Sequence, residues 1–244
     1  KESSAASDVY KRQMEYCLDT GDLEMVKKVA DLYPIRCFSM NPSIAVNCLR
    51  GTGRTFLQNA KMIREVIGED TPFYLEAMGD TAEEMIEDAH KIRQEIKGNT
   101  MIKIPACPQG FKAIRLLKEE DILCSCTAIY DFNQAMLAAE AGAYCVAVYV
   151  SRVDNSGGDG IEVVRKIKEA FVMEGIACKV SAASLKQVNY LEKAALAGAD
   201  NVTVTLDLLE KMAIHPLTQK TLDTFKADWE SLFGEGMRVA NMTE

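Results

Sequence analysis

The chain has 244 residues, of which 48% are apolar and 26% are charged, as in an ordinary soluble globular protein. Its 28 basic residues are outnumbered by 36 acidic ones, and the net charge of −8 disfavours a nucleic-acid-binding or anionic-membrane-binding surface. No apolar run approaches the roughly 18–20 residues of a membrane span, so we expect neither nucleic acid nor a membrane as a partner.

The N-terminal residues 1–13 are polar and show no periodicity. They lack the apolar core of a signal peptide. We expect an extension here that need not be ordered, followed by a single domain over residues 14–244.

From Met14 onward, short apolar runs alternate with longer amphipathic segments. Each run has the length of a β-strand, and several are apolar on both faces, which is typical of parallel strands covered by helices. The runs are 15–20, 37–41, 72–78, 101–106, 122–129, 144–150, 178–183 and 201–206. The sequence therefore predicts eight strands.

The segments between the runs carry helix signals. Asp22 precedes apolar residues at helical spacing, and Thr81 with Glu84 forms a capping-box pattern. Gly142 and Gly198 each stand where a helix should end before a strand. Eight strand–helix units without a composition break predict an α/β fold, a single (β/α)8 TIM barrel with an additional C-terminal helix.

A doubly wound open sheet is the alternative architecture. Its nucleotide-binding members carry glycine-rich phosphate loops. No GxGxxG follows the first strand and no GxxxxGK[ST] occurs in the chain, so the barrel is favoured.

Eight cysteines and two histidines raise the question of disulfides and metals. There is no CxxC, and neither His90 nor His215 has a partner at metal-ligand spacing. Most of the cysteines lie in or beside the apolar runs, where cysteine acts as a small core residue; they are Cys17, Cys37, Cys124, Cys126, Cys145 and Cys178. We expect reduced thiols in a cytoplasmic protein, with no metal and no cofactor.

Polar side chains stand at the carboxyl end of nearly every predicted strand. In a barrel these ends meet at one face, where the chemistry takes place. In chain order they are Asp19, Ser39, Asn41, Glu76, Lys103, Thr127, Tyr149, Arg152, Ser184 and Lys186. Arg152, Ser184 and Lys186 follow strands six and seven, close to where barrels often bind phosphate.

Lys103 is the most informative of these residues, because it lies between Ile102 and Ile104 in an apparently buried strand. One interpretation is a lysine that extends to solvent or pairs with a buried carboxylate. The other is a nucleophile: burial would lower its pKa and leave a neutral amine able to attack a carbonyl. A lysine pointing into a barrel has no easy route to water, which favours Schiff-base chemistry.

Several stretches together resemble the small transaldolase and fructose-6-phosphate aldolase family, class I Schiff-base enzymes with a (β/α)8 fold. The matching stretches are LDTGD (18–22), MNPS (40–43), IKIP (102–105), CTAIYDFNQA (126–135), AAEAGA (138–143), YVSRVDNSGGDGI (149–161), SAAS (181–184), and HPLT and FKADW near the end. They span nearly all of the chain beyond the extension.

The resemblance implies a role for each strand-end residue. Lys103 would form the Schiff base with the C2 carbonyl of a ketose, and Asp19 would take the proton from the C4 hydroxyl. Glu76 and Thr127 would hold the catalytic water, and Tyr149 would act beside them. Substrate binding would fall to Ser39 and Asn41 for hydroxyls and to Arg152, Ser184 and Lys186 for the sugar phosphate. Ser39-Met40 replaces the family's usual Thr-Thr.

Two positions bear on the reaction, and they point in opposite directions. Transaldolase-type members carry Glu at the position of Glu76, whereas Tyr149 matches the aldolase-type members. We expect transfer of a dihydroxyacetone unit between sugar phosphates. Reversible cleavage to dihydroxyacetone and glyceraldehyde 3-phosphate is the alternative, and a non-catalytic sugar-phosphate-binding barrel is the remote one.

The final segment, Thr218 to Phe233, carries Leu222, Phe225, Trp229 and Phe233 at roughly helical spacing. Packing on its own barrel would explain this pattern. The resemblance implies a homo-oligomer instead, since small members form rings, often decamers, in which a C-terminal helix reaches a neighbour.

Overall fold

A computed structural model describes residues 13–242 of the chain. The chain divides into two compact units, a barrel that ends at Leu206 and a C-terminal unit that begins at Asp207. The expected extension, residues 1–13, lies almost entirely outside the described residues. No helix within residues 13–242 is long and apolar enough to cross a membrane.

Eight parallel strands form a closed barrel in sequence order, β1 to β8, with β8 pairing with β1. The strands are β1 (Glu15–Asp19), β2 (Cys37–Met40), β3 (Phe73–Glu76), β4 (Thr100–Pro105), β5 (Cys124–Ile129), β6 (Cys145–Tyr149), β7 (Lys179–Ala183) and β8 (Asn201–Val204). Each lies within or one residue from a predicted run. The predicted α/β class and the TIM barrel are therefore confirmed.

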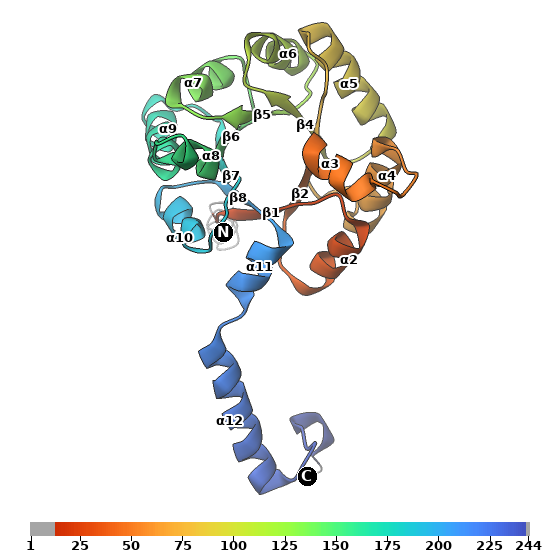
Figure 1. Cartoon of the computed structure of the whole chain (residues 1–244), viewed down its shortest axis with the longest axis vertical. Helices are drawn as coiled ribbons and strands as arrows, with labels where there is room; N and C mark the ends of the chain where they lie inside the picture. Colours follow the sequence, from red (N-terminus) through yellow and green to blue (C-terminus); the bar gives the residue numbers. More distant parts are fainter. Residues whose placement is uncertain (1–12, 243–244) are drawn as a thin grey trace, which may run out of the picture. The chain divides into compact units, whose positions relative to one another are not determined.

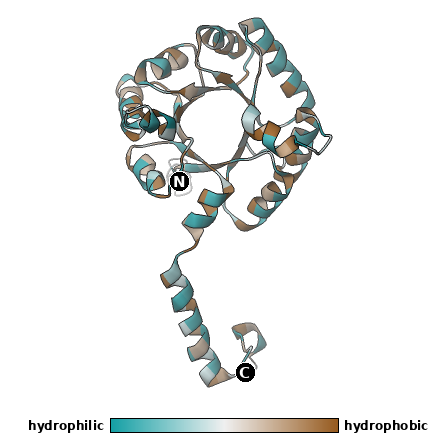
Figure 2. Cartoon of the chain, in the orientation of Figure 1, coloured by the Kyte–Doolittle hydropathy of each residue, from teal (hydrophilic) through white to brown (hydrophobic). Residues whose placement is uncertain are grey.

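Helices surround the strands as an outer ring (Figure 1). They are α2 (Leu23–Leu32), α3 (Pro42–Leu49), α4 (Phe56–Ile67), α5 (Ala82–Glu95), α6 (Pro108–Glu119), α7 (Phe132–Glu140), α8 (Val150–Asn155), α9 (Gly160–Glu174) and α10 (Asn189–Leu196). Hydrophilic and hydrophobic residues alternate along these helices (Figure 2), as expected for helices with one face on a sheet. The loops after β2 and β6 hold an extra helix each, α3 and α8.

Local sequence signals explain where these helices begin and end. The side chain of Asp22 caps α2, and Thr81 with Glu84 completes a capping box on α5. Gly142 and Gly198 follow helices with φ of 95° and 81°, a left-handed conformation that favours glycine. The cap predictions are confirmed.

The main core lies between the strands and the helices. Alternate strand residues point outward into it, among them Leu18, Phe73, Leu75, Ile102 and Ile104, which are completely buried. The six cysteines expected in the core are also buried. Burial raises the pKa of the Cys124 thiol to about 12, which keeps it protonated.

The C-terminal unit contains α11 (Leu206–Ala213, starting at the last barrel residue), α12 (Pro216–Phe233) and the short 3-10 helix η1 (Val239–Asn241). Its longest helix starts two residues before the predicted segment, because His215 caps it and Pro216 opens it. The ring of Trp229 packs at 4.5 Å from that of Phe233, and its Nε1 donates to Met237 O. No residue of α12 is buried.

Candidate active site

A cavity of about 470 Å³ opens at the carboxyl ends of the barrel strands. The ten residues predicted for the site all line it: Asp19, Ser39, Asn41, Glu76, Lys103, Thr127, Tyr149, Arg152, Ser184 and Lys186. The barrel topology brings them together, since they lie in or just after the carboxyl-terminal parts of seven neighbouring strands, β1 to β7.

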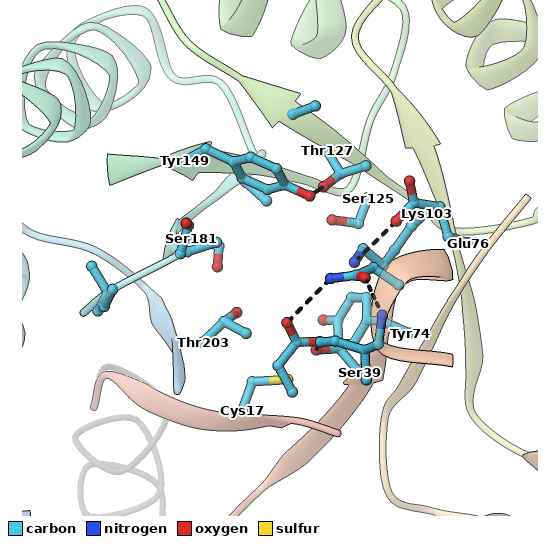
Figure 3. Close-up of a pocket in the computed structure, with 18 of the residues that line it drawn as sticks. Cys17, Ser39, Tyr74, Glu76, Lys103, Ser125, Thr127, Tyr149, Ser181 and Thr203 are labelled. Atoms are coloured by element: carbon cyan, nitrogen blue, oxygen red, sulfur yellow. Dashed lines mark hydrogen bonds and ion pairs between the residues drawn. The ribbon is translucent and has the colours of Figure 1, made fainter. Parts of the chain in front are cut away.

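Lys103 and Glu76 form an ion pair inside the barrel (Figure 3). They are register partners on β4 and β3, and Lys103 Nζ lies 3.2 Å from Glu76 Oε2. Only 9% and 15% of the two side chains are exposed. Lys103 is therefore paired with a buried carboxylate, which was one of the two interpretations. The pair lies inside the cavity, so Lys103 is also placed where a nucleophile could reach a substrate.

The expected lowering of the Lys103 pKa is wrong. Burial does oppose the charge on Lys103, but the attraction of Asp19, Glu76 and Tyr149 outweighs it and raises the pKa above its usual value. The resting side chain is therefore an ammonium group. It can act as a nucleophile only after passing a proton to a neighbour, and its ion-pair partner Glu76 is adjacent.

Asp19 is held at the end of β1 by two neighbours. Ser39 Oγ donates to Asp19 Oδ1 at 2.7 Å, and Asn41 Nδ2 lies 3.5 Å from Oδ2. Asn41 Oδ1 also caps α3 by accepting from Ile44 N, which fixes its orientation. Burial raises the pKa of Asp19, and the opposing influences of Lys103, Ser39 and Lys186 only reduce that rise. A carboxylate with a raised pKa is suited to accept a proton.

Thr127 and Tyr149 face the same cavity from β5 and β6. The fully buried Thr127 donates from Oγ1 to the Tyr149 hydroxyl at 3.2 Å (Figure 3). Because the tyrosine oxygen accepts this bond, its own proton is left for another partner. The next residue, Ala128, has φ of 57° where the β5–β6 register shifts. This left-handed backbone is strained for alanine and marks the bend at which Thr127 enters the cavity.

Arg152 lies at the cavity mouth on α8. Its guanidinium stacks over the Tyr149 ring at 4.7 Å, and its Nη1 donates to the Tyr130 hydroxyl at 3.4 Å. The bond to Tyr130 raises the pKa of Arg152. Tyr130 also packs edge-on against Tyr149, with ring centroids 6.0 Å apart. The sequence stretch CTAIYDF contained Tyr130, but nothing local marked it as a partner of Arg152.

Gly160 explains how α8 fits at this mouth. A Cβ atom at Gly160 would lie 2.5 Å from Val150 O, closer than side chains are found in proteins. Residues 157–160 (GGDG) supply the Asp159 cap of α9, and the last glycine lets α9 approach the first turn of α8.

Ser184 and Lys186 complete the mouth after β7. Ser184 is half-buried with φ of 59°, a strained conformation, and Lys186 is exposed. Together with Arg152 they place two cations and a hydroxyl around the opening. Within residues 13–242, no three His, Cys, Asp or Glu side chains gather as a metal ion would require.

The floor of the cavity contains residues that sequence reasoning missed. Ser125, Ser181, Asn201 and Thr203 line it together with Cys17 and Cys145. In Figure 3, Ser181 and Thr203 lie across the cavity from Lys103. Their only signal in the sequence is the period-2 alternation of each strand, which places them on the inward face.

Comparisons with known proteins point to one family over nearly the whole chain. The model of the Transaldolase/Fructose-6-phosphate aldolase family matches residues 16–244. A "Probable transaldolase" of Brachyspira hyodysenteriae is 34% identical over 222 residues, which are 91% of this chain and 100% of the relative. A "Probable fructose-6-phosphate aldolase" of Streptococcus pneumoniae is 36% identical over 216 residues, 88% of this chain and 96% of the relative.

A solved structure supports the fold independently. Thiamine phosphate pyrophosphorylase from Pyrococcus furiosus superposes with a TM-score of 0.54 over 80% of this chain and 87% of that one. The sequence identity is 15%, so the likeness concerns the barrel alone.

Proposed function

This chain belongs to the transaldolase and fructose-6-phosphate aldolase family, and we propose that it transfers a dihydroxyacetone unit from a ketose phosphate to an aldose phosphate through a Schiff base on Lys103. The donor is fructose 6-phosphate or sedoheptulose 7-phosphate, within the pentose phosphate interconversions. The observation that carries the proposal is the buried Lys103–Glu76 pair at 3.2 Å, with Asp19 in the same cavity.

Formation of the Schiff base begins with a proton transfer. The Lys103 ammonium passes a proton to Glu76, and the freed amine attacks the C2 carbonyl of the ketose. Loss of one water molecule then gives the imine. The resting ion pair keeps the amine protected until substrate enters. Glu76 then passes the proton to the oxygen that leaves as water and is ionised again when the imine has formed.

Carbon–carbon cleavage requires a base at the C4 hydroxyl. Asp19 accepts that proton, the C3–C4 bond breaks, and its electrons flow into the imine to give an enamine. The aldose product leaves. An acceptor aldehyde then adds to C3, Asp19 returns the proton to its oxygen, and hydrolysis frees the new ketose and Lys103.

The cavity mouth is suited to the phosphate end of the substrate. Arg152 and Lys186 supply positive charge and Ser184 supplies a hydroxyl, so a phosphate would be anchored there while C2 reaches Lys103. Ser39 and Asn41 hold Asp19 and can share their remaining donors with substrate hydroxyls.

Aldol cleavage with release of free dihydroxyacetone is the second candidate. The observation that favours it is the Thr127–Tyr149 hydrogen bond, which leaves the tyrosine proton available to an enamine carbon. A carboxylate at Glu76 favours transfer instead, because an ionised group supplies no proton and the enamine would survive until an acceptor arrives.

Two measurements test the proposal. Borohydride reduction in the presence of fructose 6-phosphate should trap an adduct on Lys103, and Lys103→Ala should abolish it. With wild-type protein, release of glyceraldehyde 3-phosphate beyond one equivalent per site should depend on added erythrose 4-phosphate. Free dihydroxyacetone formed without acceptor, and lost in Tyr149→Phe, would establish the aldolase reaction; no adduct on Lys103 would refute both.

Two further properties belong to the proposal. A cytoplasmic location is supported by eight cysteines that are all free. A homo-oligomer is supported by α12, on which the C-terminal unit itself leaves Leu217, Leu222, Phe225 and Leu232 uncovered. The same apolar face on a second copy of the chain could cover these side chains, whereas a polar surface would not match them.

A further inference from the structure

The cavity extends below the level of Lys103 into the interior of the barrel. Inward side chains of a (β/α)8 barrel stack in layers of four, contributed by alternate strands and filled mainly with Val, Ile and Leu. The register places Lys103 beside Ser125, Ser125 beside Cys145, and Ser181 between Ala147 and Asn201. Ser125 and Ser181 therefore occupy positions that usually hold large apolar residues.

Small side chains leave this side of the interior open. Ser125 and Ser181 face the cavity from β5 and β7, with Ala147 and Thr203 next to them on β6 and β8. The lining continues past them to Cys145 and Asn201, deeper in the barrel. We call the space bounded by Ser125, Ser181, Asn201 and Thr203 the polar well.

The polar well contains a hydrogen-bonding group without a partner. Asn201 is 3% exposed, and its Oδ1 accepts no hydrogen bond within the described chain although it lines the cavity. A buried amide oxygen normally has a partner, because leaving it unpaired costs free energy. The serine hydroxyls nearby add further donors and acceptors. The polar well is thus equipped to bind hydroxyl groups of a ligand.

The orientation of the bound substrate decides which of its carbons would enter the polar well. Under the proposed function, the phosphate lies at the mouth with Arg152 and Lys186, C4 lies at Asp19, and C2 is bonded to Lys103. The carbon on the other side of C2 must then point away from the mouth, toward the polar well. Dihydroxyacetone places only one hydroxymethyl group there.

We propose, resting on the proposed function, that the site accepts a longer donor, a polyhydroxy ketone with an additional hydroxylated carbon in the polar well. The simplest such donor is 1,3,4-trihydroxybutan-2-one. Lys103 condenses with its C2 carbonyl and releases water, and C1 loses a proton to give the enamine. C1 then bonds to the carbonyl carbon of an aldehyde, whose oxygen takes a proton, and hydrolysis frees the product. With glyceraldehyde 3-phosphate the product is an unbranched seven-carbon sugar phosphate with its carbonyl at C3.

The test compares two donors with the full-length protein and glyceraldehyde 3-phosphate as acceptor. Wild type should use the four-carbon donor with kcat/KM within about tenfold of dihydroxyacetone, because the extra polar carbon has partners in the well. Product NMR should show the carbonyl at C3. A branched product would overturn the proposal, since it would mean that the longer arm points toward the acceptor.

Filling the polar well should separate the donors. Ser181→Leu should lower kcat/KM for both donors, but at least about tenfold more for the four-carbon donor, since its arm reaches further into the polar well than the single hydroxymethyl group of dihydroxyacetone. Ser125→Val is the second variant should Ser181→Leu fail to fold. Thr205 lines the same cavity directly after the end of β8 and is exposed. Thr205→Leu, which adds bulk there and not in the polar well, is the matched control and should not discriminate between donors.

Borohydride trapping distinguishes the possible failures. An adduct of Lys103 with dihydroxyacetone but not with the four-carbon ketone would overturn this inference and leave the proposed function standing. Absence of both adducts would overturn the two together.

Discussion

At the residue scale, the hydrogen bond from Ser39 to Asp19 should set the acid limit of catalysis. The Ser39 hydroxyl lowers the pKa of Asp19, opposing the larger effect of burial that raises it. Asp19 must be ionised to accept the C4 proton, so activity is lost as pH falls through its pKa. Ser39→Ala should raise that pKa and move the acid limb of the kcat–pH profile to higher pH.

Ser39→Thr is the control for this prediction, because it keeps the hydroxyl and should keep the wild-type profile. An acid limb that stays in place in Ser39→Ala while kcat falls would mean that Asp19 does not titrate in the rate-limiting step.

Tyr130 should matter for phosphate binding through Arg152. Tyr130→Phe keeps the ring that packs on Tyr149 and removes the hydroxyl that accepts from Arg152. One hydrogen bond contributes about 0.5–1.5 kcal/mol, so KM for fructose 6-phosphate should rise about two- to tenfold with little change in kcat. Steady-state kinetics would check this. KM for unphosphorylated fructose should not change; an equal rise for both sugars would exclude a role in phosphate binding.

The ten predicted site residues could be found from the sequence because each stands at or near the carboxyl end of a strand. In a barrel these ends form the face that carries the chemistry. Sequence reasoning missed Tyr130, since its partner Arg152 comes from another loop. It also gave the wrong direction for the Lys103 pKa, because burial could be inferred from Ile102 and Ile104 but the net effect of Asp19 and Glu76 depends on distances.

At the element scale, Arg64 ties α4 to the amino-terminal ends of β3 and β4. The side chain is 7% exposed and donates to Gly68 O, Thr71 O, Asn99 O and Thr100 Oγ1 at 2.6–3.1 Å. Arg64→Met would leave these acceptors without their donor. We expect a loss of about 3 kcal/mol in the free energy of unfolding, measured by urea denaturation.

Arg115→Met is the matched control for Arg64→Met. The Arg115 side chain is 59% exposed, and its one ion pair among residues 13–242 is with Glu119 at 3.4 Å, so its replacement should cost less than about 0.5 kcal/mol. If both variants lost the same free energy of unfolding, the carbonyl oxygens that Arg64 binds would have to be hydrogen-bonded by water in Arg64→Met, and the prediction would be wrong.

The elements themselves were largely predictable, and the exceptions have physical reasons. Asp22, Thr81, Gly142 and Gly198 mark helix ends through local chemistry that a sequence displays directly. The extra helix α3 is opened by Asn41 as its cap and by Pro42, whereas the resemblance in sequence implies only a substrate-binding role for Asn41. Similarly, α8 is short and begins directly after β6, so it has no capping signal of its own.

At the scale of the whole molecule, the barrel follows from the repeated strand–helix pattern, whereas the assembly does not. Leu222, Phe225 and Trp229 have the spacing of one helical face, and that pattern is the same whether the face packs on its own chain or on another. Within the C-terminal unit this face is not covered, since Phe225 is 64% exposed.

Association through α12 leads to the last prediction. Phe225→Asp places a charge within the apolar face, and burying an unpaired carboxylate is unfavourable, so the variant should dissociate toward single chains. Sedimentation equilibrium should give wild type a mass that is a multiple of one chain. Ala227→Asp adds the same charge on the opposite side of the helix and should leave that mass unchanged. A wild-type mass equal to one chain, or equal dissociation in the two variants, would show that this face is not the interface.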